Sequence, residues 1–229
     1  TYTGATTISA GTLKLGNASA LGSTTGSTSI TSGAVLDLNG VNYTNAEALT
    51  INGTGISSGG AVINSSATGA TYAGLVTLGS ASSIVGGTGS ITLSHSGTIT
   101  GTYALTLGGA IGGTITSIIG TSTGTLTKAD AGTWTLNGVN TYSGNTTISA
   151  GTLAIGGSGS LGSGSYSGSL AVSSGATFQY SSSSNQSFGS GASGILAAGT
   201  GTILLNGSGV VTINGNNAFT GTLNVAQSL

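Results

Sequence analysis

Few side chains in this chain of 229 residues could perform acid–base chemistry or hold a metal. There are two lysines, one histidine, no cysteine and three carboxylates, namely Asp37, Glu47 and Asp130. Two carboxyl groups that cleave a glycosidic bond must converge to about 5–9 Å. The three carboxylates here are far apart in the sequence. We therefore expect no catalytic pair among them.

The only histidine, His95, lies between Ser94 and Ser96. Neighbouring residues of a strand point to opposite faces, so adjacency alone gives no serine–histidine pair. We expect His95 to face solvent or to bind backbone groups at a corner. A calcium-binding solenoid needs an aspartate in every turn, and only two exist. The sequence predicts no catalytic residue, no cofactor and no metal site.

The scarcity of charge also excludes classes of partner. Nucleic-acid binding depends on clustered lysine and arginine, and the chain has only Lys14 and Lys128. No basic amphipathic face exists for a membrane surface. No apolar run approaches the roughly 18 residues of a membrane-spanning helix. We expect no nucleic-acid partner and no membrane-spanning segment in these residues.

The elements that position these groups are encoded in a repeat. TYTGATTISAGTL at residues 1–13 returns as TYSGNTTISAGTL at residues 141–153, and only two of the thirteen positions differ. An internal repeat of this length indicates stacked units. We predict one continuous solenoid over residues 1–229, part of a longer protein, with repeat words at 1–23 and 124–163.

Short segments throughout the chain alternate apolar and polar residues with the period of two that is typical of β-strands. We expect Leu36 and Leu38 to point inward and Asp37 outward. The inward residues expected in the second repeat are Leu126, Trp134, Leu136, Ile148, Leu153 and Ile155. The aromatic residues Tyr2, Tyr142 and Phe219 are expected to be packed coil residues and not ligand-stacking platforms.

Asn-Gly pairs end several of these segments, beginning at Asn39, Asn52, Asn137, Asn206 and Asn214. Both residues tolerate positive φ, so each pair indicates a sharp change of chain direction. Alone, such pairs favour β-hairpins and an antiparallel sandwich or barrel. The short strands and the constant order of the repeated words favour stacked coils.

Residues 124–156 read GTLTKADAGTWTLNGVNTYSGNTTISAGTLAIG. This stretch resembles the autotransporter-associated β-strand repeat, or passenger-associated repeat, of large bacterial surface proteins. It departs from the family wording at Asp130, where glycine is usual, at Trp134, where leucine is usual, and at Asn137, where serine is usual. The resemblance implies a right-handed parallel β-helix, a β-solenoid, outside the bacterial cell.

A coil of roughly 22 residues and an inter-strand spacing of about 4.8 Å would give about ten coils. Lys14 and Asp37 hold the same place in successive Leu-X-Leu words, 23 residues apart. We expect them to stack on one outer face as an exposed ion pair that contributes about 0.2–1 kcal/mol.

Three functions compete. The leading one is a structural, non-catalytic shaft of a bacterial adhesin or cell-surface filament, whose units stack end to end because uncovered strand edges attract other strands. The second is a module that binds glycans or ice through outward threonines, although the Thr114–Thr116, Thr125–Thr127 and Thr133–Thr135 pairs are spaced too unevenly to predict one regular array. The third, a polysaccharide-cleaving enzyme, needs a carboxylate cluster that the sequence does not offer.

Overall fold

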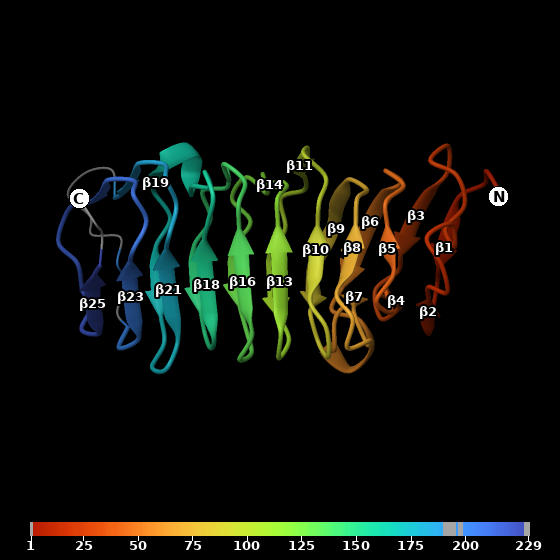
Figure 1. The fold of residues 1–229 in the computed structure, drawn as a ribbon, viewed down its shortest axis with the longest axis horizontal. Coiled ribbons are helices and arrows are strands. Elements are labelled where there is room, and N and C mark those ends of the chain that lie inside the picture. Colours follow the sequence, from red (N-terminus) through yellow and green to blue (C-terminus); the bar gives the residue numbers. More distant parts are fainter. Residues whose placement is uncertain (1, 190–195, 197–198, 227–229) are drawn as a thin grey trace.

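The computed structural model describes residues 2–189, 196 and 199–226. They form one elongated stack of short β-strands, with the two ends of the chain at opposite ends of the stack (Figure 1). Two single-turn 3-10 helices, η1 (Ile56–Ser58) and η2 (Gly162–Gly164), interrupt the strands. No helix in the described ranges has the length and apolar character needed to cross a bilayer. The predicted all-β fold is confirmed.

Two large sheets and two small ones form the walls. The nine-stranded sheet contains β5 (Asn42–Tyr43), β8 (Ala70–Tyr72), β10 (Ile91–Leu93), β13 (Gly112–Ile115), β16 (Thr133–Leu136), β18 (Thr152–Ile155), β21 (Thr177–Tyr180), β23 (Thr202–Leu205) and β25 (Thr222–Val225). The eleven-stranded sheet contains β1 (Thr6–Ile8), β2 (Thr12–Lys14), β3 (Ser27–Ile30), β4 (Val35–Asp37), β6 (Ala48–Gly53), β7 (Val62–Ile63), β9 (Val76–Val85), β12 (Leu105–Gly108), β15 (Leu126–Lys128), β17 (Thr146–Ile148) and β20 (Leu170–Val172). The small sheets pair β11 (Thr98–Ile99) with β14 (Ile118–Ile119), and join β19 (Ser165–Tyr166), β22 (Gln186–Phe188) and β24 (Val211–Ile213).

The pairings of the described strands are parallel, and each joins a strand to its counterpart in a neighbouring coil. The nine-stranded sheet takes one strand from each coil, and the coil of β1 and β2 precedes it, so nine plus one gives ten coils. The prediction of about ten coils is confirmed. The hairpin alternative is wrong, because hairpin strands are antiparallel. Right-handed winding stays a prediction.

One long strand connects two walls of the solenoid. The first part of β9 pairs with β6, and its last residues pair with β7 on one side and β12 on the other. The register shifts between Ile51 and Gly53, where β9 passes from one wall to the next. A single ten-residue strand therefore merges what would otherwise be two sheets.

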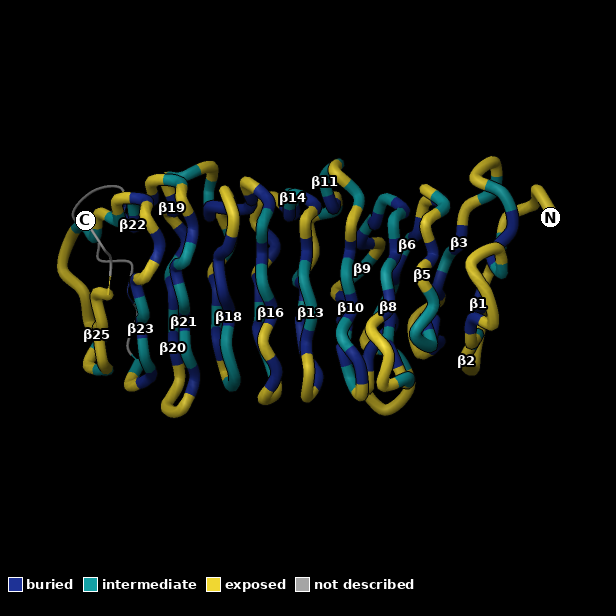
Figure 2. Tube along the Cα trace, viewed as in Figure 1, coloured by how far each residue is buried: buried dark blue, intermediate teal, exposed yellow. Residues whose placement is uncertain are grey.

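Inward residues stack in columns along the axis. One such column in the nine-stranded sheet runs from Ile91 through Gly113, Trp134, Leu153, Phe178 and Ile203 to Leu223. All six inward residues predicted for the second repeat are buried. Figure 2 shows buried stretches along the strands and exposed residues concentrated at the corners and in the terminal coils. Period two alone therefore identified these six core residues of the repeat.

The repeated aromatic position behaves differently at its three sites. Tyr142 is fully buried, and Phe219 is partly buried against the core. Tyr2 is 48 % exposed, so the prediction that it packs inside is wrong. Tyr2 lies in the first described coil, where a coil packs on one side only.

The predicted changes of direction at Asn-Gly pairs are only partly matched by positive φ. Asn39, Gly40, Gly53 and Gly215 have positive φ. Gly138 and Gly207 do not, so these two turns are made by ordinary backbone conformations.

A glycine makes room for the one tryptophan. Gly113 lies directly beside Trp134 in the inward column. A Cβ on Gly113 would lie 2.0 Å from the carbonyl oxygen of Ile91 and 3.0 Å from the Trp134 ring. The indole Nε1 donates to the Gly108 carbonyl at 2.9 Å. The large ring is thus accommodated by the absence of a side chain in the preceding coil.

Replacing Gly113 by alanine should destabilise the fold, because a backbone oxygen and a buried ring would both have to move. Overpacking of this kind costs about 1–3 kcal/mol. Denaturant unfolding of Gly113→Ala should show this loss in the free energy of unfolding. Gly16→Ala is the matched control, since a Cβ there meets no atom within 4 Å. Equal stabilities of the two variants would contradict the proposed role of Gly113.

Candidate functional site

The ionisable side chains do not converge. Among the described residues, no group of three or more His, Cys, Asp and Glu side chains could hold a metal ion. Instead, the charged residues and His95 occupy four separate corners of the solenoid, each satisfied by local hydrogen bonds. The structure therefore shows what each group does in its own corner.

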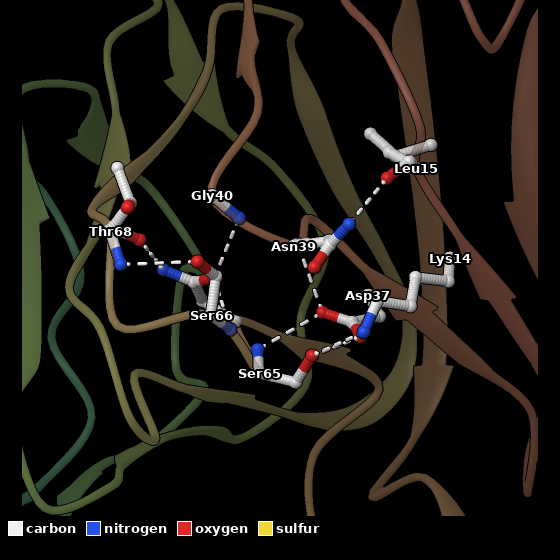
Figure 3. A network of polar contacts seen from close by, with 9 residues as sticks. Lys14, Leu15, Asp37, Asn39, Gly40, Ser65, Ser66 and Thr68 are labelled. Atoms are coloured by element: carbon white, nitrogen blue, oxygen red, sulfur yellow. Dashed lines mark hydrogen bonds and ion pairs between the residues drawn. The ribbon is translucent and has the colours of Figure 1, made fainter.

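Lys14 and Asp37 are paired across neighbouring coils, as predicted. They are direct register partners in β2 and β4, and Lys14 Nζ lies 3.8 Å from Asp37 Oδ2. The expectation of an exposed pair is wrong for the carboxylate, because the Asp37 side chain is only 4 % exposed against 56 % for Lys14. Ser65 of the next coil covers it and donates from its backbone N–H at 3.0 Å and from Oγ at 2.6 Å (Figure 3). The Asn39 N–H also donates to Asp37 at 2.9 Å.

Asp37 therefore serves mainly as a hydrogen-bond acceptor that joins three coils. Figure 3 shows how the contacts continue around the same corner. Asn39 Nδ2 donates to the Leu15 carbonyl, and the Gly40 N–H donates to Asn64 Oδ1. Lys14 Nζ donates to Ser65 Oγ at 3.2 Å. Charge-assisted hydrogen bonds to backbone donors are stronger than exposed ion pairs.

Glu47 is fully buried between two tyrosines. Its carboxylate accepts from Thr28 Oγ1 and from the Tyr43 hydroxyl, both at 2.6 Å. The Tyr72 hydroxyl donates to the Glu47 backbone carbonyl at 2.8 Å, and the Tyr43 and Tyr72 rings stack 5.4 Å apart. Burial, together with the nearby Glu47 carboxylate, raises the pKa of both tyrosines. The cluster is closed to solvent and holds a corner together.

Lys128 is a buried lysine inside the core. It takes the inward position between Leu107 and Ile148, and no part of it is exposed. Its ammonium donates to the carbonyls of Ala129, Asp130 at 2.8 Å and Ala150 at 3.1 Å. Burial lowers the pKa of the Lys128 ammonium to about 8, and the Asp130 carboxylate opposes this shift.

Three carbonyls from two successive coils thus surround one ammonium group. The neighbouring Asp130 has positive φ and accepts from the Gly109 N–H at 2.7 Å. The corner is therefore bound to the preceding coil through Asp130 and to the following coil through Lys128. We interpret Lys128 as a structural group that satisfies carbonyls at a sharp corner.

His95 acts within its own corner. Its Nδ1 accepts from the Gly97 N–H at 2.8 Å, and its backbone carbonyl accepts from Ser117 Oγ at 2.6 Å. The prediction that His95 binds backbone at a corner is confirmed. The two neighbouring serines are exposed and make no contact with its ring in the described part of the chain.

A tyrosine–threonine hydrogen bond recurs in the repeated words, buried in the second and exposed in the first. The Tyr142 hydroxyl and Thr146 Oγ1 are 2.8 Å apart, and Thr146 Oγ1 is 2.7 Å from the Tyr166 hydroxyl. Tyr2 and Thr6 repeat the contact at 2.6 Å in the first coil. Burial raises the pKa of Tyr142, and it raises that of Tyr166 to about 12.

The outer faces carry regular threonine ladders, which the sequence spacing did not predict. Four consecutive coils place Thr71, Thr92, Thr114 and Thr135 in direct register on the nine-stranded sheet. Five consecutive coils place Thr133, Thr152, Thr177, Thr202 and Thr222 in a neighbouring column. Within the described residues, none of these hydroxyls has a protein hydrogen-bond partner.

The uneven spacing in the sequence arose because the Thr125–Thr127 pair lies on a different wall from the other two Thr-X-Thr pairs. Thr127 belongs to the eleven-stranded sheet, between Thr106 and Thr147. Thr114 and Thr135, in contrast, are direct neighbours on the nine-stranded sheet. The three pairs therefore form no single regular array, as the uneven spacing indicated, and the regular arrays are instead columns of one threonine per coil.

A ladder of parallel coils around apolar columns, with polar groups satisfied at the corners, defines a repeat β-solenoid. Comparison with family models finds the passenger-associated-transport-repeat at residues 1–15, 126–155 and 205–227. The chain therefore carries the passenger-associated transport repeat, a structural repeat of autotransporter passenger domains, which are secreted or surface-exposed. Comparisons with curated proteins and with solved structures gave no match.

The central copy of this repeat, residues 126–155, pairs with itself. Its first two strands, β15 and β16, lie directly against its last two, β17 and β18. Lys128 reaches across this pairing to the Ala150 carbonyl. One copy of the repeat is thus two stacked corners of the solenoid and not a single coil.

Sequence reasoning did not identify the roles of Lys128 and Glu47, although signals for both were present. Lys128 is two residues after the inward Leu126, so the period of two already placed it inside. Glu47 is four residues after Tyr43, the same spacing as Thr146 after Tyr142. In both cases the spacing indicated an inward position for a charged residue.

The free energy of unfolding should rise with pH because of Lys128. An unfolded lysine keeps its proton up to about pH 10.5, whereas folded Lys128 releases it near pH 8. The unfolded state binds more protons between these values, so stability increases there. The full gain is about 3 kcal/mol. Above about pH 10, buried tyrosines oppose it, because tyrosines ionise first in the unfolded state.

Denaturant unfolding of the protein and of Lys128→Met between pH 7 and about 10 measures this effect. The free energy of unfolding of the unmodified protein minus that of Lys128→Met should increase with pH above 8. Lys14→Met is the control and should leave the slope unchanged. A difference that is flat or falls with pH would show that Lys128 is not a buried ammonium.

Proposed function

We propose that this segment is a non-catalytic shaft in a bacterial surface protein, an adhesin or filament, that supplies reach and rigidity. The observation that carries the proposal is the unbroken stack of ten coils, in which each coil contacts its neighbours through parallel ladders. The satisfied, separated charges support it, because each serves a corner. The passenger-associated repeat supports export to the cell exterior.

End-to-end association is part of this proposal. In the described part, β1 and β25 each pair with a strand on one side only. Free strand edges accept further strands, from the same chain or from another molecule. Coils added to either edge would continue the existing columns and lengthen the shaft.

The threonine ladders favour a second candidate function, binding of a neutral glycan or an ice surface. The hydroxyls repeat once per coil, at about 4.8 Å, on a continuous sheet face. No lysine, aspartate or glutamate lies in either column, so the face presents hydroxyls without charge. A rigid array of this kind can match a ligand that is itself periodic.

Removal of one coil should leave a shaft functional. Deleting residues 91–112 joins Ser90 to Gly113, which is the register partner of Ile91. The coil of β8 then meets the coil of β13 in register. We expect cooperative unfolding to persist and the rod to shorten by about 4.8 Å in small-angle scattering. The parent protein should remain displayed and attach normally.

Deletion of residues 91–101 is the control, because half a coil destroys the register and should abolish cooperative unfolding. Loss of attachment by a displayed one-coil deletion would contradict a shaft and place a binding site in that coil.

The second function predicts that bulky residues in the ladder weaken binding. Thr92→Tyr with Thr114→Tyr should reduce the affinity for insoluble neutral glycans by about tenfold, which is 1.4 kcal/mol, or reduce thermal hysteresis. Thr106→Tyr with Thr127→Tyr changes the same residue types on the other large sheet and should have little effect. Absence of both activities in the unmodified protein would reject the second function.

A further inference from the structure

The five Asn-Gly pairs share a reactive chemistry that the fold controls. In such a pair the glycine nitrogen can attack the asparagine side-chain amide, because glycine has no side chain to hinder the approach. The reaction needs a free side-chain amide and a free glycine N–H. The hydrogen bonds of each pair therefore determine its reactivity.

In two pairs, both the asparagine side-chain amide and the glycine N–H are hydrogen-bonded. Asn39 Nδ2 donates to the Leu15 carbonyl, and the Gly40 N–H donates to Asn64 Oδ1, each at 2.9 Å. Asn52 Nδ2 donates to the Ile30 carbonyl at 2.9 Å, and the Gly53 N–H donates to Ser80 Oγ at 3.0 Å.

In the next two pairs, the asparagine side chain, the glycine N–H or both make a hydrogen bond. The Gly207 N–H donates to the Tyr180 carbonyl at 2.9 Å, and Asn206 Oδ1 accepts from Gln179 at 3.4 Å. Asn214 Nδ2 donates to Ser187 Oγ at 2.9 Å and to the Gly189 carbonyl at 2.8 Å.

Asn137-Gly138 differs from all four. Among the described residues, neither the Asn137 side chain nor the Gly138 N–H has a hydrogen-bond partner. The Asn137 backbone N–H is fixed to the Ile115 carbonyl at 2.8 Å, so the residue is anchored while its amide is free. Its Oδ1 lies over Gly156, where a Cβ would be only 2.8 Å away. The side chain is half-buried at the corner after β16.

We propose that Asn137 is a site of spontaneous deamidation in the folded protein. The Gly138 nitrogen loses its proton to water and forms a bond to Asn137 Cγ. The Cγ–Nδ2 bond breaks, and Nδ2 leaves as ammonia after taking up a proton. Water then opens the five-membered succinimide at either carbonyl and gives aspartate or isoaspartate. No oxidation or reduction occurs.

The product would alter a repeat corner. Either form places a new carboxylate in a chain that has three. Isoaspartate also adds a methylene to the backbone between β16 and the Val139–Ser160 bridge. The buried Asn140 lies three residues after Asn137 and donates to the Gly138 and Ser160 carbonyls. Modification would therefore disturb the register of this coil with the next.

Incubation of the intact folded protein in mildly alkaline buffer, followed by peptide mass spectrometry that separates aspartate from isoaspartate, tests the proposal. Asn137 should convert about tenfold faster than the other four asparagines, or about 1.4 kcal/mol in activation free energy. In concentrated denaturant the five rates should become similar. Equal rates in the folded protein, or faster conversion at another pair, would overturn the proposal.

Ser80→Ala provides an internal test, because it frees the Gly53 N–H while Asn52 Nδ2 stays bonded to the Ile30 carbonyl. Conversion of Asn52 should therefore remain slow in the folded protein, and that of Asn137 should stay unchanged. If Asn52 then converts as fast as Asn137, a free side-chain amide is not required, and the structural basis of the proposal is wrong. Asn137→Ser should abolish the modified peptide and leave the other rates unchanged.

Discussion

The register between successive coils is the constraint on which the rest of this structure depends. Parallel pairing places each residue directly against its counterpart about 4.8 Å away, on both sides. A charged residue repeated in a column would face like charges at this spacing, at a cost of about 1 kcal/mol per pair even in water. Threonine avoids this cost, is a good strand former, and keeps its hydroxyl available to water. The composition of the chain thus follows from its register.

The same constraint fixes the interior. An inward column has nearly constant width, so a large residue requires a small one next to it, as Trp134 requires Gly113. Where Tyr142 bonds Thr146, the corresponding later word has Phe219 followed four residues on by Leu223, and the hydroxyl and its partner are both lost. Some polar groups enter the core beside corners, where carbonyls leave the ladders and need donors. Lys128 and the Glu47 cluster are both of this kind.

The period of two and the repeated words were sufficient to predict a stacked solenoid, its number of coils, the inward residues of the second repeat and the stacking of Lys14 on Asp37, while the parallel pairing was implied by the resemblance to the passenger-associated repeat. They were insufficient wherever a contact came from a coil that the pattern did not align. Ser65 covers Asp37 from 28 residues away, and Ala150 binds Lys128 from 22 residues away. The threonine columns were missed for the same reason, since coil length varies from 19 residues between Thr133 and Thr152 to 29 between Asn42 and Thr71.

The placement of Lys128 also bears on the order in which the solenoid assembles. Two of its carbonyl partners belong to its own corner, and the third, Ala150, arrives only with the following coil. Until that coil docks, the ammonium remains hydrated and its corner is incompletely satisfied. Docking exchanges that water for the Ala150 carbonyl, so the desolvation that lowers the pKa of Lys128 is incurred when the following coil adds. One buried ammonium thereby makes the completion of a corner depend on the coil that comes after it.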